Sequence, residues 1–185
     1  LPRVLSPVVI AALFSWIYNP TFGILNATLD AIGLGSMKRE WLADPNLALL
    51  MVIISASWQY IGFCILLFLA GIQRIPTEIH EAARIDGARE WQRFFFVTIP
   101  LLREIFAIVL VYTVIGSMRV FDYVFIMTKG GPNHATEVLA TYMYWSAFQW
   151  FDMGRATAIA VLLFVALLSV SILQIRLITR ETMEY

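Results

Sequence analysis

Polar and aromatic side chains interrupt two long apolar segments of this sequence. Gln59 and Tyr60 lie near the middle of one segment. Phe121 and Asp122 lie within another, close to Arg119. Polar groups at membrane depth are costly and tend to face a cavity or a partner. An aromatic ring can cover the C–H face of a sugar while neighbouring amide and hydroxyl groups bind its hydroxyls, so these residues are candidates for contact with such a solute.

The same residues also have a structural interpretation. Arg119 and Asp122 are three positions apart, so on one helix they can form a local ion pair, and we favour that interpretation for Arg119. For Gln59, Tyr60, Phe121 and Asp122, the sequence leaves solute contact and structural packing equally open. Contact with a second membrane subunit is a further alternative.

The composition is that of an integral membrane protein. Of the 185 residues, 60% are hydrophobic and 14% are charged, whereas a soluble domain carries about 25% charged residues. The 13 basic and 13 acidic residues give zero formal net charge, so nothing indicates nucleic acid as a partner. Cys64 is the one cysteine, so no internal disulfide is possible.

Four apolar segments predict an all-α, polytopic transmembrane bundle. A spanning helix needs about 20 apolar residues. The segments run over Ala156 to Ile175, Leu47 to Ile72, Ile105 to about Thr128, and, shorter than the others, Val4 to Tyr18.

Basic residues in the connecting segments predict the orientation, because lysine and arginine favour the cytoplasmic side. Three fall on one side: Lys38, Arg39 and Lys129. Eight fall on the other, which makes both chain ends cytoplasmic: Arg3, Arg74, Arg84, Arg89, Arg93, Arg103, Arg176 and Arg180.

The sequence contains no group of residues suited to catalysis, metal binding or ATP binding. His80 and His134 lie on opposite sides of the membrane, and no His, Cys or carboxylate cluster has metal-ligand spacing. Gly130-Gly131-Pro132 is a turn without the lysine of a nucleotide-binding P-loop. We therefore predict no catalytic residue, no metal site and no ATP hydrolysis by this chain.

The charged stretch EIHEAARIDGAREWQRF, residues 78–94, predicts a short helix on the cytoplasmic side. Pro76 suits its first turn, and Gly87 allows a left-handed exit. Ala82 and Ala83 share one face with Asp86 and leave room for close approach of another surface. From these properties alone, a helix lying on lipid headgroups is the simplest interpretation.

The spacing within this stretch resembles a known motif. Glu81-Ala82-Ala83 is followed by three residues, Gly87, nine residues and Val97-Thr98-Ile99-Pro100. This arrangement resembles the "EAA" loop of binding-protein-dependent ABC transporter permeases, which has EAA, three residues, G, nine residues and I-x-L-P. Val97 and Ile99 are the only departures, and both are apolar.

The flanking segments resemble the carbohydrate-type permeases related to the maltose and glycerol-phosphate transporters. They are LAGIQRIPTEIHEAARIDGAREWQRFFFVTIPLL, FDYVFIMTKGGP and YWSAFQWFDMGRATAIA. Such subunits have at least six spans, so the resemblance implies that this chain lacks the first two. It also implies one permease domain over residues 1–185, with the EAA coupling loop at about 73–103.

The resemblance implies a role for the charged helix and a set of partners. The helix would seat in a cleft of an ATPase subunit, with Glu81 as anchor, Ala82 and Ala83 as the closely packed face, Asp86 beside them and Gly87 at the turn. The expected partners are a second permease subunit, an ATPase dimer that binds the ATP, an extracytoplasmic solute-binding protein and the lipid bilayer. No cofactor is expected on this chain, which would sit in a prokaryotic inner membrane and import a sugar or a sugar-like solute.

Two alternatives stay open at this point. The EAA loop alone also fits an ABC permease for a non-sugar solute. The residues Asp86-Gly87-Ala88-Arg89 partly resemble the signature of CDP-alcohol phosphatidyltransferases, which are membrane-embedded enzymes. Here the spacing between the glycine and the alanine differs, and the two further aspartates of that signature are absent.

Overall fold

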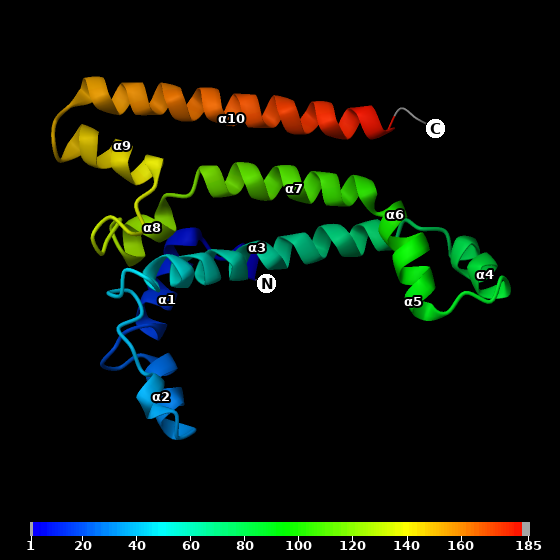
Figure 1. Cartoon of the computed structure of the whole chain (residues 1–185), viewed down its shortest axis with the longest axis horizontal. Coiled ribbons are helices and arrows are strands. Elements are labelled where there is room, and N and C mark those ends of the chain that lie inside the picture. Colours follow the sequence, from blue (N-terminus) through cyan, green and yellow to red (C-terminus); the bar gives the residue numbers. More distant parts are fainter. Residues whose placement is uncertain (1, 183–185) are drawn as a thin grey trace.

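The computed structural model describes residues 2–182, and all the regular secondary structure in them is helical, as the sequence predicts (Figure 1). Short 3-10 segments cover Pro2–Val4 and Gly35–Met37, and a π-helical segment covers Phe94–Thr98. The α-helices are α1 (Pro7–Ile17), α2 (Ile24–Ala31), α3 (Ala48–Ile72), α4 (Thr77–Ile85), α5 (Glu90–Arg93), α6 (Ile99–Leu101), α7 (Arg103–Met118), α8 (Asp122–Met127), α9 (Leu139–Phe148) and α10 (Met153–Thr182).

Three long helices, α3, α7 and α10, lie side by side and form the body of the molecule (Figure 1). Among the described residues, α3 and α10 are each long and apolar enough to cross a membrane. The segment Glu90–Leu101 and α7 qualify together as one span, bent by 64°. We call the end of this layer that carries α4 the α4 end, and the opposite end the α2 end.

Two predicted spans differ from the structure. The first is only the 11-residue helix α1, which begins at Pro7. The third does not continue to Thr128, because α7 ends at Met118 and α8 begins at Asp122. The break has a packing reason: the turn brings Tyr123, Val124 and Met127 of α8 onto α1 and α3, which a straight continuation of α7 would prevent.

The basic residue nearest the N-terminus is also not where the sequence predicts it. The guanidinium of Arg3 lies 5.9 Å from the ring centroid of Tyr60 and 5.8 Å from that of Phe63. Both rings belong to the middle of α3, so Arg3 lies at mid-depth of the bundle and the prediction that it belongs with the basic residues of the α4 end was wrong. The prediction that both chain ends are cytoplasmic falls on Leu1 and residues 183–185, which lie outside the described residues.

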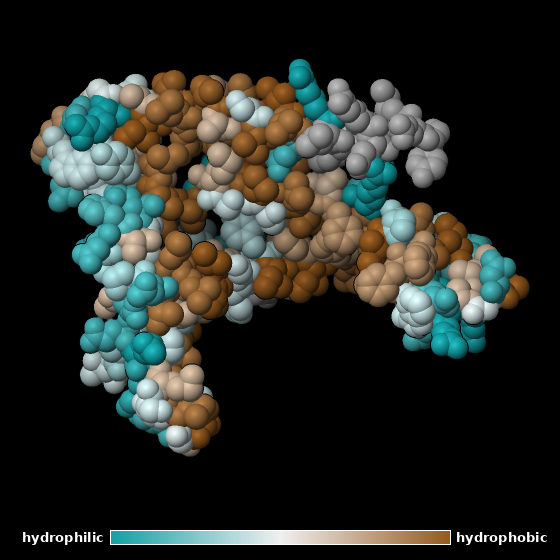
Figure 2. All heavy atoms as spheres, in the orientation of Figure 1, coloured by the Kyte–Doolittle hydropathy of each residue, from teal (hydrophilic) through white to brown (hydrophobic). Residues whose placement is uncertain are grey.

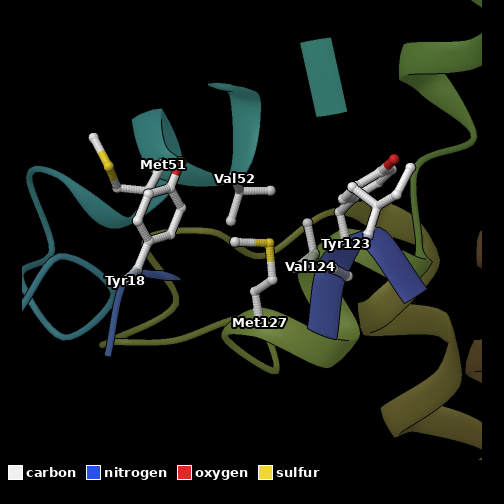
Figure 3. Packing of buried hydrophobic residues seen from close by; sticks show 8 residues of the cluster. Tyr18, Met51, Val52, Tyr123, Val124 and Met127 are labelled. Atoms are coloured by element: carbon white, nitrogen blue, oxygen red, sulfur yellow. The ribbon is translucent and has the colours of Figure 1, made fainter. Parts of the chain in front are cut away.

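A small core at the α2 end holds α1, α3 and α8 together. Val52 of α3 and Val124 of α8 are buried in it, and Figure 3 shows their side chains together with those of Met51 and Met127. The full cluster of buried residues is Ile10, Ala11, Tyr18, Met51, Val52, Tyr123, Val124 and Met127.

Most other apolar side chains remain exposed along the bundle. On the face seen in Figure 2, hydrophobic residues cover much of the layer, and hydrophilic ones gather toward the α2 end and around α4. Ile61 and Ile65 of α3 and Leu162 and Phe164 of α10 are each more than half exposed. A surface of this kind is stable against lipid or another membrane subunit.

One buried side chain, that of Asn26, holds the segment between α1 and α3 in place. Its Nδ2 donates to the carbonyl oxygens of Pro20 and Arg39, at 3.3 and 3.1 Å. Its Oδ1 accepts a hydrogen bond from Trp41 Nε1 at 2.8 Å. This one amide therefore joins Pro20, just after α1, to Arg39 and Trp41, in the last third of the 30-residue segment between α1 and α3.

We expect Asn26→Ala to loosen this connection, because it leaves two carbonyls and an indole N–H without their partner. The cost should be about 2–4 kcal/mol in the free energy of local opening, measured as the rate of proteolysis within residues 20–41 in membrane vesicles. Asn46→Ala, at an exposed position in the same connection, is the matched control. Equal proteolysis of the two variants would contradict the assignment.

Candidate functional site

A cavity of about 860 Å³ follows one face of α7. It reaches from Glu104, in the first turn of α7, to Arg119, at the C-cap of that helix. Sixteen helical residues rise about 24 Å, so the cavity runs most of the way across the layer. All four candidates for solute contact line it: Gln59, Tyr60, Phe121 and Asp122.

Gln59 lines the cavity, but its amide is bound within the chain. The side chain is 1% exposed. Its Nε2 donates to the carbonyl oxygen of Leu5 at 2.7 Å, and its Oε1 accepts from the Tyr123 hydroxyl at 2.6 Å. Gln59 therefore joins the segment before α1, the middle of α3 and the start of α8, and its place here is structural.

Tyr60 contributes to an aromatic wall of the cavity. The ring centroids of Tyr60 and Tyr112, which is on α7, are 5.7 Å apart. The ring centroids of Tyr112 and Phe63 are 4.7 Å apart. A Cβ added at Gly116 would lie 2.6 Å from the Tyr60 hydroxyl oxygen. The glycine therefore makes the space into which the Tyr60 hydroxyl fits.

The residues at the far end of the cavity are not arranged as the sequence predicts. The helix is interrupted between Arg119 and Asp122, and the described part of the chain contains no ion pair between them. The predicted pair needed a continuous helix, which the turn into α8 removes. Phe121 instead stacks on Phe125, with ring centroids 4.9 Å apart and planes 18° apart.

The charged stretch forms α4, whose end is closed as predicted. Gly87 has φ +79°, the left-handed conformation that glycine adopts readily. The N–H of Gly87 donates to the carbonyl of Arg84 at 3.1 Å, and that of Ala88 donates to the carbonyl of Ala83 at 3.0 Å. These two bonds form a Schellman motif, so the helix ends sharply after Asp86.

Nothing in the described chain covers α4. None of its residues is buried, Glu81 and Ala82 are exposed and Ala83 is half-buried, and Ile85 is 85% exposed. A nine-residue helix is too short to be stable in water by itself. An uncovered helix with an apolar residue at its tip is therefore suited to binding another protein.

A short, tightly packed path joins α4 to the layer of long helices. The π-helical segment Phe94–Thr98 and α6 lead into α7 through the 64° bend. Leu102, at the bend, is buried, and a Cβ added at Gly71 of α3 would lie 2.8 Å from its Cδ2. The bend is therefore in close contact with the end of α3.

Comparison with known proteins identifies the family. Residues 1–182 match the model described as "Binding-protein-dependent transport system inner membrane component". The chain belongs to this family. Its position there overturns the alternative of a phosphatidyltransferase-like enzyme, because the relatives are transport permeases.

Individual permeases match nearly all of the chain. "Probable ABC transporter permease protein YurN" of Bacillus subtilis is 45% identical over 176 residues, which are 95% of this chain and 60% of YurN. The trehalose/maltose transport system permease protein MalF of Thermococcus litoralis is 33% identical over 95% of this chain and 59% of MalF. The chain therefore spans about three fifths of the length of these relatives.

A solved structure has the same arrangement of helices. It is the bacterial alginate ABC transporter in complex with alginate pentasaccharide-bound periplasmic protein. One of its chains superposes with a TM-score of 0.87 at 28% identity, over 99% of this chain and 63% of that one. The all-helical permease fold predicted from the sequence is confirmed.

The cavity residues that sequence reasoning missed include Arg3, Tyr112 and Gly116. Tyr112 carried the signal that singled out Tyr60, a hydroxyl inside an apolar run, and could have been found in the same way. Gly116 gave no signal until its contact with Tyr60 was known. Arg3 was assigned to a membrane surface because only the folded chain brings it beside α3.

The hydrogen bonds of Gln59 to Leu5 and Tyr123 predict that changes at Gln59 and Tyr123 affect the unfolding free energy non-additively. Gln59→Leu leaves the Tyr123 hydroxyl and the Leu5 carbonyl without a partner, and should lower the free energy of unfolding in a bilayer or detergent by about 1–2 kcal/mol. Combining Gln59→Leu with Tyr123→Phe should cost less than the sum of the two single changes.

Gln149→Leu, at an exposed position after α9, is the matched control and should leave the unfolding free energy unchanged. Additive effects of Gln59→Leu and Tyr123→Phe would show that the two side chains do not interact in the folded protein.

Proposed function

We propose that this chain is part of the permease subunit of an ATP-driven ABC importer for a sugar or a sugar-like solute. The observation that carries the proposal is the placement of the EAA motif on the uncovered helix α4. The whole motif lies on one continuous path from that helix to the wall of the cavity. Membership in the binding-protein-dependent family supports the same conclusion.

In this proposal α4 is the coupling helix and an ATPase subunit covers it. Glu81 would form a charge-assisted contact with that subunit, and Ala82 and Ala83 would allow the two surfaces to approach closely. The exposed Ile85 adds an apolar contact at the tip, where the sharp end of the helix leaves the side chain unobstructed. Asp86 and Gly87 would fix the turn that presents this surface.

Motion of α4 would reach the cavity through the bend before α7. Leu102 lies against Gly71, and Ile105 of α7 lies against the same glycine. A push on α4 and α5 would therefore act on the ends of α3 and α7 together. These two helices carry Tyr60 and Tyr112, so tilting them would change access to the cavity. Such rigid-body movement is a known means of alternating access.

The cavity is suited to a carbohydrate. Tyr60 and Tyr112 offer flat ring faces for C–H groups and hydroxyls for hydrogen bonds. Phe121 and Asp122 extend this lining toward the α2 end. The name of the Thermococcus relative refers to trehalose and maltose, and the superposed structure is of an alginate transporter. Both support a sugar as the solute over the other solutes that ABC permeases carry.

The proposed assembly contains a second permease subunit, two ATPase subunits and an extracytoplasmic binding protein in a prokaryotic inner membrane. ATP would be bound by the ATPase subunits, and this chain would need no cofactor or nucleic acid. The α4 end would be cytoplasmic. With Arg3 removed from the count, and Arg155 at the start of α10 added to the α2 end, basic residues still favour the α4 end by seven to four. The seven are Arg74, Arg84, Arg89, Arg93, Arg103, Arg176 and Arg180, and the four are Lys38, Arg39, Lys129 and Arg155.

Glu81→Lys tests the coupling role. Reversing the charge at a protein contact replaces an attraction with a repulsion, so ATP-dependent uptake by the complete transporter in liposomes should fall about tenfold or more. The permease should remain in the membrane, because Glu81 makes no buried contact in this chain. Co-purification with the ATPase subunit should weaken in parallel.

Glu40→Lys is the control, because it makes the same charge reversal at an exposed position near the α2 end. It should transport at the normal rate. Normal uptake and normal ATPase binding by Glu81→Lys would show that α4 is not the coupling helix.

A further inference from the structure

Arg3 has an unusual position for a cation. Its guanidinium carbon lies 5.9, 5.8 and 5.7 Å from the ring centroids of Tyr60, Phe63 and Tyr112. Tyr60 and Phe63 are in the middle of the 25-residue helix α3, and Tyr112 is within α7. The charge therefore lies at mid-depth of the layer, between two spanning segments, and its side chain lines the cavity.

No carboxylate of the described chain pairs with Arg3. The two acidic residues that line the cavity lie toward its ends. Glu104 is eight residues before Tyr112, which is about 12 Å along α7. Asp122 lies beyond the last residue of α7. Among the described residues that line the middle of the cavity, Arg3 is therefore a cation without a carboxylate at ion-pair distance. A charge at membrane depth is costly, and such residues tend to mark the pathway of a solute or an ion.

The aromatic rings hold the guanidinium without using its hydrogen-bond donors. A cation–π contact engages the face of the ring and the charge, whereas the five N–H groups of arginine point outward in the guanidinium plane. Those donors form a rigid fork that matches the oxygens of a carboxylate, sulfonate or phosphate group. A second cation, Arg119, lines the same cavity farther along α7.

We infer that the transported solute carries an anionic group, and that Arg3 binds this group in the middle of the cavity. The inference rests on the proposed function, and it narrows the solute from sugars in general to acidic sugars, such as those with a carboxylate, a sulfonate or a phosphate. Tyr60 and Tyr112 would then have two roles: they orient Arg3, and they contact the sugar ring next to the acidic group.

The test is ATP-dependent uptake by the complete transporter in liposomes, with its binding protein supplied. The probes are neutral sugars matched with acidic ones: disaccharides of glucose and glucuronate, of galactose and galacturonate, and of mannose and mannuronate, and glucose matched with 6-deoxy-6-sulfoglucose and with glucose 6-phosphate. We expect at least one acidic probe to be transported in preference to its neutral counterpart.

Arg3→Gln should then lower kcat/KM for that acidic probe about 10- to 100-fold, which is the range for losing a hydrogen-bonded charge contact. The loss should appear mainly in KM, and Arg3→Lys should restore part of it. Arg39→Gln removes one positive charge at an exposed position outside the cavity and should have no effect. Basal ATPase activity and co-purification of the subunits show whether each variant is assembled.

Three outcomes would overturn the inference. Transport of only neutral probes would show that the cavity does not select an anion. If Arg3→Gln leaves the preference for acidic probes unchanged, Arg3 does not bind the anionic group of the solute. In the third outcome, Arg3→Gln fails to assemble, while Arg3→Lys assembles and takes up the neutral and the acidic member of a pair equally. Arg3 would then have only a structural role. If no sugar of either kind is transported while ATPase coupling is intact, the sugar assignment of the proposed function fails as well.

Discussion

The arrangement of the cavity depends on one buried amide, that of Gln59. Lipid cannot supply hydrogen bonds to a polar group inside the bundle, so such a group must find its partners within the protein. Gln59 finds them on two segments that are distant in the sequence, at the Leu5 carbonyl and the Tyr123 hydroxyl. Satisfying one side chain thereby fixes the entry of α1 and the start of α8 against the middle of α3.

Two glycines determine how closely α3 and α7 approach. Gly71, near the end of α3, accommodates Leu102 and Ile105, and Gly116, near the opposite end of α7, accommodates Tyr60. Small residues let membrane helices pack closely where no hydrophobic driving force exists between them. Between these two contacts aromatic rings separate the helices, and the cavity runs along this region and past Gly116 to Asp122.

Sequence reasoning predicted the features that depend on neighbouring residues. The bounds of α3 followed from an apolar run, and the exit at Gly87 followed from glycine's access to positive φ. It did not predict features that depend on distant contacts. The turn at residues 119–121 forms because α8 packs on α1 and α3, and neither helix is near it in the sequence. Arg3 was misplaced for the same reason, since a count of charges gives the side of the membrane but not the depth of one side chain.

The π-helical segment Phe94–Thr98 determines the side of the Glu90–Leu101 segment on which α4 lies. A π-turn contains about one residue more than an α-turn, and one residue of an α-helix corresponds to a rotation of about 100° around its axis. Without the additional residue, α4 would be rotated by about 100° around the axis of the Glu90–Leu101 segment. The orientation of α4 around this segment is therefore determined by one turn that does not itself belong to α4.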